Sequence, residues 1–305
     1  MATAQTSSPL TRRVYDAERD RRRGRLVNPF YLFACLCEDA LQVYRFRMAL
    51  ANMVGTRLKV RYQRSFLGFL WTLLNPLLML AVLSIVRSVW RGRSISEVIM
   101  YLFAGLLPWQ FFSATISHNA TAMVSNQQLI RKIYVPKLVF PTAGALVNAV
   151  NMVFAMAALF VLLQLVGAPV ATQFVLLPIA IGLLLVFSLG LGLVLMVLTT
   201  FYRDMEHMIS VVLRAGFFLS PILWEVGGRH GMRGRSEWFD WIIRLNPMTY
   251  MLELFHTIFY YHTTPHYPDW PSMEHWLILI CLTVGAALLG YAVYKKYEPK
   301  LIFRL

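Results

Sequence analysis

Long apolar runs with almost no charged residues dominate the chain after about residue 65. Most of them reach the roughly 20 residues that a helix needs to cross the hydrocarbon core of a bilayer. Short polar segments rich in Lys and Arg separate the runs. The pattern therefore predicts an all-α integral membrane protein with about six transmembrane helices, at residues 66–86, 98–117, 138–166, 172–199, 208–224 and 276–294.

Residues 38–65, ahead of the first run, mix apolar and basic positions. Leu41, Tyr44 and Met48 recur at helical spacing and form an apolar stripe, while Arg and Lys supply the charge. This pattern predicts an amphipathic interface helix on the cytoplasmic surface of the membrane. A helix that packs on a soluble partner explains the pattern equally well. Residues 1–37 are expected to form a basic cytoplasmic tail.

The loops between the runs indicate the orientation. With the N-terminus placed inside, Lys and Arg are far more numerous on the inner side than on the outer side, and cytoplasmic loops carry such an excess. Both termini, including the C-terminal tail 295–305, are therefore expected in the cytoplasm. The same topology makes 118–137 a cytoplasmic loop and 225–275 an outer loop.

The outer loop contains a predicted helix. Asn246 followed by Pro247 is typical of a helix start, because Asn caps free N–H groups and Pro fits the first helical position. Apolar residues then follow a 3.6-residue period from Met248 to Phe259. We expect a short amphipathic helix that lies against the outer bilayer surface or against the bundle.

Composition supports a membrane protein. Of 305 residues, 58% are hydrophobic and 14% are charged, whereas soluble domains carry about 25% charged residues. A net charge of +14 also suits nucleic acid, but the basic residues lie between apolar runs and at the chain ends, so we expect no nucleic-acid partner. The three cysteines have no metal-binding or redox spacing and are expected to be free thiols.

The sequence contains no recognisable catalytic or nucleotide-binding motif. The dipeptide Gly-Lys does not occur, so a phosphate-binding loop of the G-x-x-x-x-G-K-[ST] type is absent. His256, His262 and His266 in the outer loop are expected to be exposed residues that bind no metal. Carboxylates, which enzymes acting on sugars or phosphates usually need, are almost missing from the apolar runs. We therefore expect neither an enzyme nor a bound cofactor.

Five groups of short motifs follow one another along the chain. They are residues 61–68 with Trp71 and 74–77, residues 105–112, residues 125–136, residues 201–204 with 218–222, and Asn246-Pro247 with the aromatic segment after it. In this order they resemble the ABC-2 type permeases, and more narrowly the exporters of polysaccharides and polyol-phosphates, such as O-antigen, capsule and teichoic acid permeases. The likeness runs from about residue 40 to the C-terminus. The tail 1–37 is longer than we expect for the family.

The resemblance implies a fold and an assembly. The fold is an ABC-2 transmembrane domain like that of type V exporters over residues 66–294, with 225–275 as an outer gate loop. Two copies of such a permease form one channel as a homodimer. Two separate ATP-binding subunits dock below it and hold ATP and Mg, which accounts for the missing phosphate-binding loop.

The resemblance also implies a function. It is the export of a lipid-linked polysaccharide or polyol-phosphate across the bacterial cytoplasmic (inner) membrane, with further export partners expected in the periplasm. One alternative is a membrane glycosyltransferase or polymerase that acts on lipid-linked sugars. The other is an ABC-2 exporter of a drug or a small lipid.

In the family, the cytoplasmic loop 118–137 carries the helix that couples the permease to the ATPase. Unbalanced cations and apolar anchors in this loop suit such a contact. The same cations also suit a loop that merely follows the positive-inside rule. The predicted coupling residues are Ile130, Arg131, Lys132, Tyr134 and Lys137.

Residues of the first and fifth spans are candidates for the translocation path. Aromatic side chains can stack on sugar rings, although most aromatics near span ends anchor the protein in the membrane interface. Proline inside a helix removes a hydrogen bond and bends the axis, which can serve gating or simply fix a kink. The channel candidates are Trp71, Asn75, Phe217 and Phe218, and the gating kinks are Pro76 and Pro221.

Basic residues beside the first span, and one within the fifth, are candidates for binding an anionic lipid head group. For those beside the first span, attraction to anionic lipid of the inner leaflet is the slightly better explanation. Arg214 differs, because a charge inside an apolar span is costly and marks a functional position. The head-group candidates are Arg57, Lys59, Arg61, Arg64 and Arg214.

Overall fold

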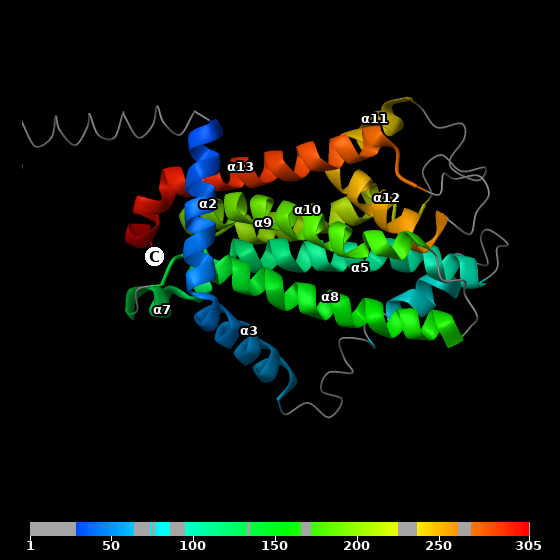
Figure 1. Ribbon diagram of the computed structural model, residues 1–305, viewed down its shortest axis with the longest axis horizontal. Helices are drawn as coiled ribbons and strands as arrows, with labels where there is room; N and C mark the ends of the chain where they lie inside the picture. Colours follow the sequence, from blue (N-terminus) through cyan, green and yellow to red (C-terminus); the bar gives the residue numbers. More distant parts are fainter. Residues whose placement is uncertain are drawn as a thin grey trace, which may run out of the picture.

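The computed structural model describes residues 29–63, 74, 77–85, 95–132, 135–165, 172–224, 237–261 and 270–304. Every regular element in these ranges is helical, which confirms the all-α prediction for this part of the chain. Long helices run side by side as a bundle, with shorter helices at both ends (Figure 1). The elements are α2 Pro29–Arg45, α3 Arg47–Tyr62, α5 Ile95–Ala120, α6 Ala122–Ser125, α7 Gln127–Lys132, α8 Val139–Leu165, η1 Thr172–Leu176, α9 Leu177–Phe201, α10 Met205–Leu219, α11 Glu237–Leu245, α12 Pro247–Phe259 and α13 Met273–Arg304.

Four segments of the described chain are long and apolar enough to cross a membrane. They are Val98–Ala120, Val139–Ala158, Thr172–Phe201 and Met273–Leu301. These segments overlap the second, third, fourth and sixth predicted spans. In α5, 78% of the most apolar window is buried, whereas in α13 only 22% is. α5 is therefore the central helix, and α13 lies on the outside with a broad apolar face available to lipid.

Two glycines let α9 and α13 approach each other closely. A Cβ atom on Gly290 of α13 would clash with the backbone of Gly190 on α9, and a Cβ atom on Gly190 would clash with the backbone of Ala286. Helix pairs in membranes depend on close packing of this kind, which small residues permit. The α9–α13 pair thus closes one side of the bundle.

The fifth predicted span ends earlier than expected. α10 stops at Leu219 instead of residue 224, and its 15 residues measure roughly 22 Å, less than the ~30 Å of a bilayer core. Ser220 is extended, with φ −93° and ψ 149°, as expected for a residue before proline. Pro221 therefore lies in the turn after α10, and it does not kink the helix from within. Of the first predicted span, 66–86, the structure describes Leu74 and the helical residues 77–85.

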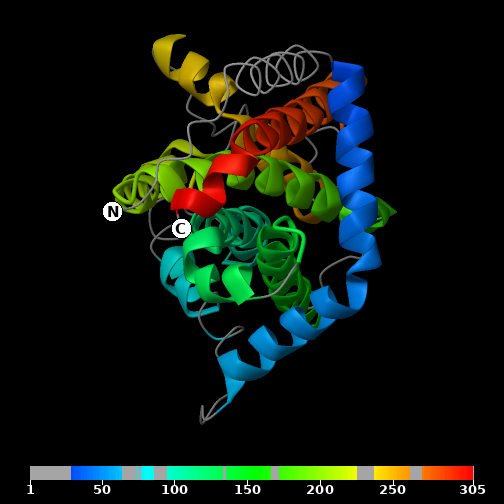
Figure 2. The same ribbon diagram turned by 90° about the vertical axis from the view of Figure 1, so that its left-hand side faces the viewer.

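The predicted interface helix 38–65 is two helices instead of one. α2 already begins at Pro29, and the backbone bends at Phe46 before α3 starts. α2 lies across one end of the bundle, and α3 continues from it in a new direction (Figure 2). The three residues of the predicted stripe, Leu41, Tyr44 and Met48, are exposed, and so are Phe33 of α2 and Val60 of α3.

The two ends of the bundle differ in their elements. α2, α7 and the last turns of α13 lie at one end, and α11 and α12 lie at the other (Figure 1). We call them the α7 end and the α12 end. The larger apolar core includes residues of α5, α9 and α12, whereas a second apolar cluster occupies the α7 end.

Candidate functional site

The second apolar cluster joins five helices at the α7 end, α2, α6, α8, α9 and α13. Its buried residues are Leu32, Ala122, Met123, Phe140, Leu193, Met196, Val197, Tyr291, Tyr294 and Leu301. Ile130 of α7 packs against this cluster but is only partly buried. No residue of α7 is buried. α7 therefore lies on the surface of the α7 end with a single apolar anchor from its own residues.

α7 presents two cations to solvent. Arg131 and Lys132 form its last turn and are exposed. Residues 118–137 contain no Asp or Glu, so no acidic residue of the loop neutralises them. The coupling role of these residues stays a prediction. Tyr134 lies outside the described residues.

Arg57 of α3 points to the segment just before α7. Its guanidinium lies 2.6 Å from Nε2 of His118 and donates to Oδ1 of Asn126 at 3.3 Å. Arg has no acceptor atom, so His118 must accept through Nε2. Gly144 of α8 makes room for the His118 ring, since a Cβ atom there would clash with the imidazole. Partial burial lowers the pKa of Arg57, but a guanidinium remains charged at physiological pH.

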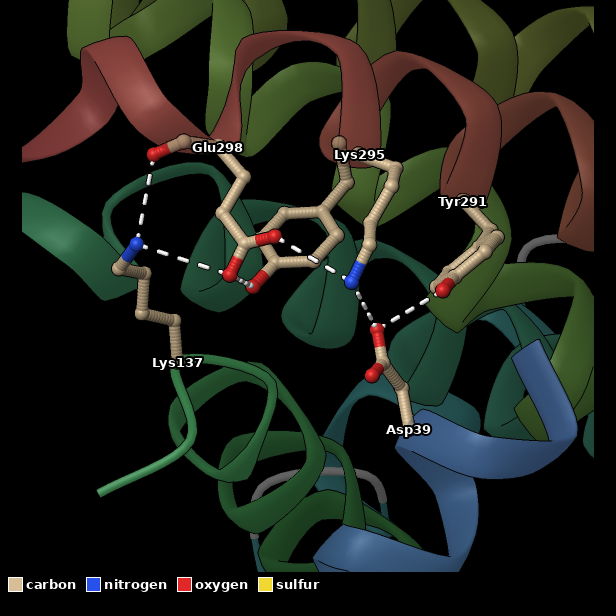
Figure 3. A network of polar contacts seen from close by, with 6 residues as sticks. Asp39, Lys137, Tyr291, Lys295 and Glu298 are labelled. Carbon is tan, nitrogen blue, oxygen red and sulfur yellow. Dashed lines mark hydrogen bonds and ion pairs between the residues drawn. The ribbon is translucent and has the colours of Figure 1, made fainter. Parts of the chain in front are cut away.

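A polar network connects the segment after α7 to α13 and α2 (Figure 3). The Lys137 ammonium donates to the Glu298 carbonyl oxygen at 3.3 Å and lies 3.6 Å from its carboxylate. Lys295 lies 3.4 Å from the other Glu298 oxygen and donates to Asp39 at 2.8 Å. Tyr291 donates to the same Asp39 oxygen, also at 2.8 Å. Lys137, a predicted coupling residue, thus binds α13 within the chain.

At the other end, α12 is buried inside the bundle. Asn246 caps it by accepting a hydrogen bond from the Met248 N–H at 3.0 Å, which confirms the predicted helix start. Ten residues of α12 are buried, so the helix packs against the bundle instead of lying on the bilayer surface. Its apolar side chains belong to the larger apolar core, and the Thr257 hydroxyl donates to the Glu253 carbonyl one turn back in the same helix at 2.9 Å.

His256 corrects one expectation directly. It was expected to be an exposed loop histidine, yet it is fully buried. Its ring stacks on Tyr101 at 4.2 Å, and its Nε2 lies 3.2 Å from the Tyr101 carbonyl oxygen. Among the described residues, no group of three or more His, Cys, Asp or Glu is arranged to hold a metal. His262 and His266 lie outside the described residues.

Glu253 of α12 faces the start of α13. Its carboxylate lies 3.6 Å from Nδ1 of His275, and the other ring nitrogen of His275 donates to the Tyr250 carbonyl at 3.1 Å. Burial raises the pKa of the Glu253 carboxyl to about 7. This acid is therefore partly protonated near neutral pH, and it joins α12 to α13.

α10 exposes an apolar face that contains a charge. Met208, Val211, Val212 and Phe218 are more than half exposed, and Arg214 is exposed on the same helix. Phe217 is partly buried and meets Trp109 edge-on at 6.1 Å. Phe217 and Phe218, both predicted channel residues, thus differ in their surroundings, and only Phe218 is open to a ligand or a second chain.

The other predicted site residues are described only in part. Lys59 is exposed on α3, as a head-group ligand must be. Arg61 lies on α3, but its side chain is outside the described residues, as are the whole residues Trp71, Asn75, Pro76 and Arg64.

Sequence reasoning missed both polar links at the α7 end. Arg57 and Asn126 are 69 positions apart, and Lys295 and Asp39 are 256 positions apart. A local pattern has no signal for such pairs. The one available hint was Asp39 itself, one of two acids on a helix that is otherwise apolar and basic.

The described part of the chain is helical, with four segments long and apolar enough to cross a membrane, a buried helix at one end and a cationic surface helix at the other. This is the architecture of an integral membrane protein. Residues 49–260 match the ABC-2 type transporter family. Because this match covers more than half of the chain, the protein belongs to the ABC-2 type transporter family.

Similar proteins include several polysaccharide exporters. The chain is 33% identical to the O-antigen export system permease protein RfbA of Myxococcus xanthus over 73% of this chain and 85% of that protein. It is 27% identical to a Klebsiella pneumoniae RfbA over 79% of this chain and 90% of the relative. It is also 24% identical to the polysialic acid transport protein KpsM of Escherichia coli, over 80% and 92% of the two chains. These similarities do not favour a glycosyltransferase.

Proposed function

We propose that the chain is the permease subunit of an ABC exporter that moves a lipid-linked polysaccharide or polyol-phosphate outward across the bacterial inner membrane. The observation that carries this proposal is the 33% identity to an O-antigen export permease over most of both chains. The further likeness to a polysialic acid transport protein favours a glycan over a drug or a small lipid. Both termini then lie in the cytoplasm, with the α7 end inside and the α12 end outside.

The energy source in this proposal is a separate ATP-binding subunit. The sequence has no phosphate-binding loop, so ATP and Mg are bound by the partner and this chain binds no cofactor. The exposed Arg131 and Lys132 of α7, which lack acidic neighbours in their loop, are the docking contacts. Ile130 and Tyr134 complete the surface.

The permease acts as a homodimer in this proposal, and periplasmic partners receive the glycan. The exposed apolar face of α10 supports the dimer, because Arg214 on that helix would be costly in contact with lipid hydrocarbon. A second copy covers this face, or the two copies enclose a polar path beside it. Trp71, Asn75 and Phe218 line that path, Pro76 and Pro221 shape its gates, and Lys59, Arg61 and Arg64 meet the anionic head group.

Deletion and reconstitution test the function together. Cells that lose the chain should accumulate the lipid-linked glycan on the cytoplasmic side, and expression of the chain should restore export. The purified chain should hydrolyse ATP only after a separate ATP-binding subunit is added. ATP turnover by the isolated chain, or normal surface glycan in the deletion strain, contradicts the proposal.

A further inference from the structure

The helix proposed to dock on the ATPase, α7, makes few packing contacts with the bundle through its own residues. α7 has six residues and none is buried, and so short a helix is not stable by itself in water. Its position must therefore be set largely by the chain on either side of it. Both flanking segments carry polar contacts to helices that are distant in sequence.

The first anchor fixes the segment before α7, and it consists of Arg57 of α3, His118 of α5 and Asn126. Arg57 binds His118 at 2.6 Å and Asn126 at 3.3 Å. Asn126 in turn donates to the Ala122 carbonyl at 2.7 Å, so the turn directly ahead of α7 is fixed to α6 and to α3. Because the donors of a guanidinium have a rigid geometry, Arg57 fixes both the distance and the orientation of the two groups that it binds.

The segment after α7 holds the second anchor, which consists of Lys137, Glu298, Lys295 and Asp39. These side chains alternate in charge from Lys137, at the end of the loop 118–137 that contains α7 (the α7 loop), through α13 to α2 (Figure 3). The hydroxyl of Tyr294 also donates to Glu298 at 3.1 Å. The carboxylates of Glu298 and Asp39 therefore each have more than one donor, which favours this pairing of the side chains over others.

Both anchors end on one rigid piece of chain. Arg57 belongs to α3 and Asp39 to α2, and the two helices meet at Phe46. The Phe46 N–H donates to the Gln42 carbonyl at 3.1 Å, and the Leu50 N–H donates to the Phe46 carbonyl at 2.9 Å. The hydrogen-bond ladder thus continues through the bend, so that α2 and α3 behave as one bent body. The two anchors and this body close a ring around the α7 loop.

We propose that Arg57, Lys137, Glu298, Lys295 and Asp39 are positioning residues that fix the α7 loop to the α2–α3 body, so that a displacement of α7 by the ATPase moves α2 and α3 on the membrane surface. This inference rests on the proposed function, in which α7 is the docking helix. It adds a mechanical route from the docking site to the surface helices through the last turns of α13.

The charges of the second anchor suit this role better than a role in folding. The four side chains are 16–32% exposed, so each keeps some access to water, and the two carboxylates keep another polar partner when one cation is removed. Their hydrogen bonds nevertheless define geometry, because charged donors and acceptors form short, directional contacts. Variants that remove one charge should therefore insert and assemble normally.

The amount of glycan exported per ATP hydrolysed tests whether this ring of contacts couples the two subunits. Lys137→Met keeps the apolar stem of the side chain and removes the charge, and Asp39→Asn breaks the ring at its far end. In membranes that contain the ATPase subunit, each variant should lower glycan exported per ATP hydrolysed by at least about fivefold. The double variant should be no worse than the stronger single variant, because both changes break the same connection. Lys300→Met, which removes an exposed charge from the same end of α13, should leave the ratio unchanged.

A native cysteine reports the movement independently. Cys35 lies one helical turn before Asp39 and packs partly against the second apolar cluster. With the exposed Cys37 and Cys281 replaced by Ser, maleimide labelling of Cys35 should differ between nucleotide-free and ATP-trapped complexes. The difference should disappear in Lys137→Met. The inference is overturned if Cys35 is labelled equally in the nucleotide-free and ATP-trapped complexes when Lys137 is present. It is also overturned if the difference persists in Lys137→Met.

A docking variant separates this inference from the proposed function. Arg131→Glu with Lys132→Glu should lower binding of the ATPase subunit by tenfold or more. If that variant binds the subunit and exports glycan as the unaltered chain does, the assignment of α7 as the docking helix is wrong. If docking falls as expected while Lys137→Met and Asp39→Asn keep the normal export ratio, only the positioning ring is wrong.

Discussion

The phenol of Tyr101 donates a hydrogen bond to the carbonyl oxygen of Pro221 at 3.0 Å and also bonds the Trp224 carbonyl. Tyr101 belongs to the central helix α5, and Pro221 lies in the turn that ends α10. A single buried side chain thus ties the middle of the bundle to the α12 end, where His256 stacks on the same ring.

Removing this hydroxyl should destabilise the protein without changing its shape. Tyr101→Phe leaves the ring stacking intact but deprives two backbone carbonyls of a buried donor, which costs about 1–3 kcal/mol. Thermal unfolding in detergent should therefore begin several degrees lower. Tyr202→Phe is the matched control, because that side chain is 67% exposed, and its melting temperature should not move.

The α9–α13 contact depends on the two glycines. Gly290→Leu should force the helices apart, because the new side chain meets the backbone of Gly190, and overpacking of this kind typically costs about 1–3 kcal/mol or more. Gly285→Leu is the control on the same helix, since nothing lies within 4 Å of a Cβ atom there. The yield and the melting temperature of the purified proteins measure the loss of stability in each variant. Equal losses in the two variants would contradict the close contact.

The exposed cations of α7 should determine binding of the ATPase subunit. Reversing Arg131 and Lys132 to Glu replaces attraction by repulsion, so co-purification of the subunit should fall by tenfold or more if each contact contributes roughly 1 kcal/mol. The same two charge reversals at Lys296 and Lys300, which are exposed on α13, should have a much smaller effect. Insertion of all variants is checked by their yield in membranes.

Glu253 should make stability depend on pH. Burial raises its pKa to about 7 from an ordinary value of 4.5, so the folded protein retains a proton that the unfolded chain has already released. Stability is then full below pH 4.5, falls as the pH rises from 4.5 to 7, and is level above that range. The melting temperature should drop by several degrees between pH 5 and pH 8.

Variants assign this pH dependence to one residue. In Glu253→Gln the melting temperature should change much less between pH 5 and pH 8, because an amide does not titrate. Glu274→Gln removes an exposed carboxyl from the next helix and should preserve the full drop. A drop of the same size in Glu253→Gln would show that another group is responsible.

The exposed face of α10 should lie at a dimer interface. Val211→Cys, in a chain whose three native cysteines are replaced by Ser, should form a covalent dimer with a short thiol crosslinker in native membranes. Val284→Cys on α13 is the control, because its side chain is also exposed but lies on the apolar outer helix. Crosslinking at Val284 and none at Val211 would place the interface on α13 instead.

Local physics was enough to predict much of the fold from the sequence. The length and low charge of the apolar runs specify membrane-spanning helices, since a bilayer accepts little else, and four described helices agree. Asn246-Pro247 predicts the start of α12 because a cap acts within one turn of the helix. Pro221 gave a correct signal for a change in the backbone, but it ends α10 where a kink was expected.

Only the tertiary structure decided which polar residues are in contact. The burial of His256 depends on Tyr101, 155 positions away, and the partner of Lys137 is Glu298, 161 positions away. Hydrogen bonds and ion pairs act over a few ångströms in space, and a single sequence shows nothing about distances between remote segments. The sequence by itself therefore determined the class of the protein, four of its spans and the missing phosphate-binding loop, whereas packing of α2, α12 and α13 on the bundle decided which charges face solvent and which pair within the chain.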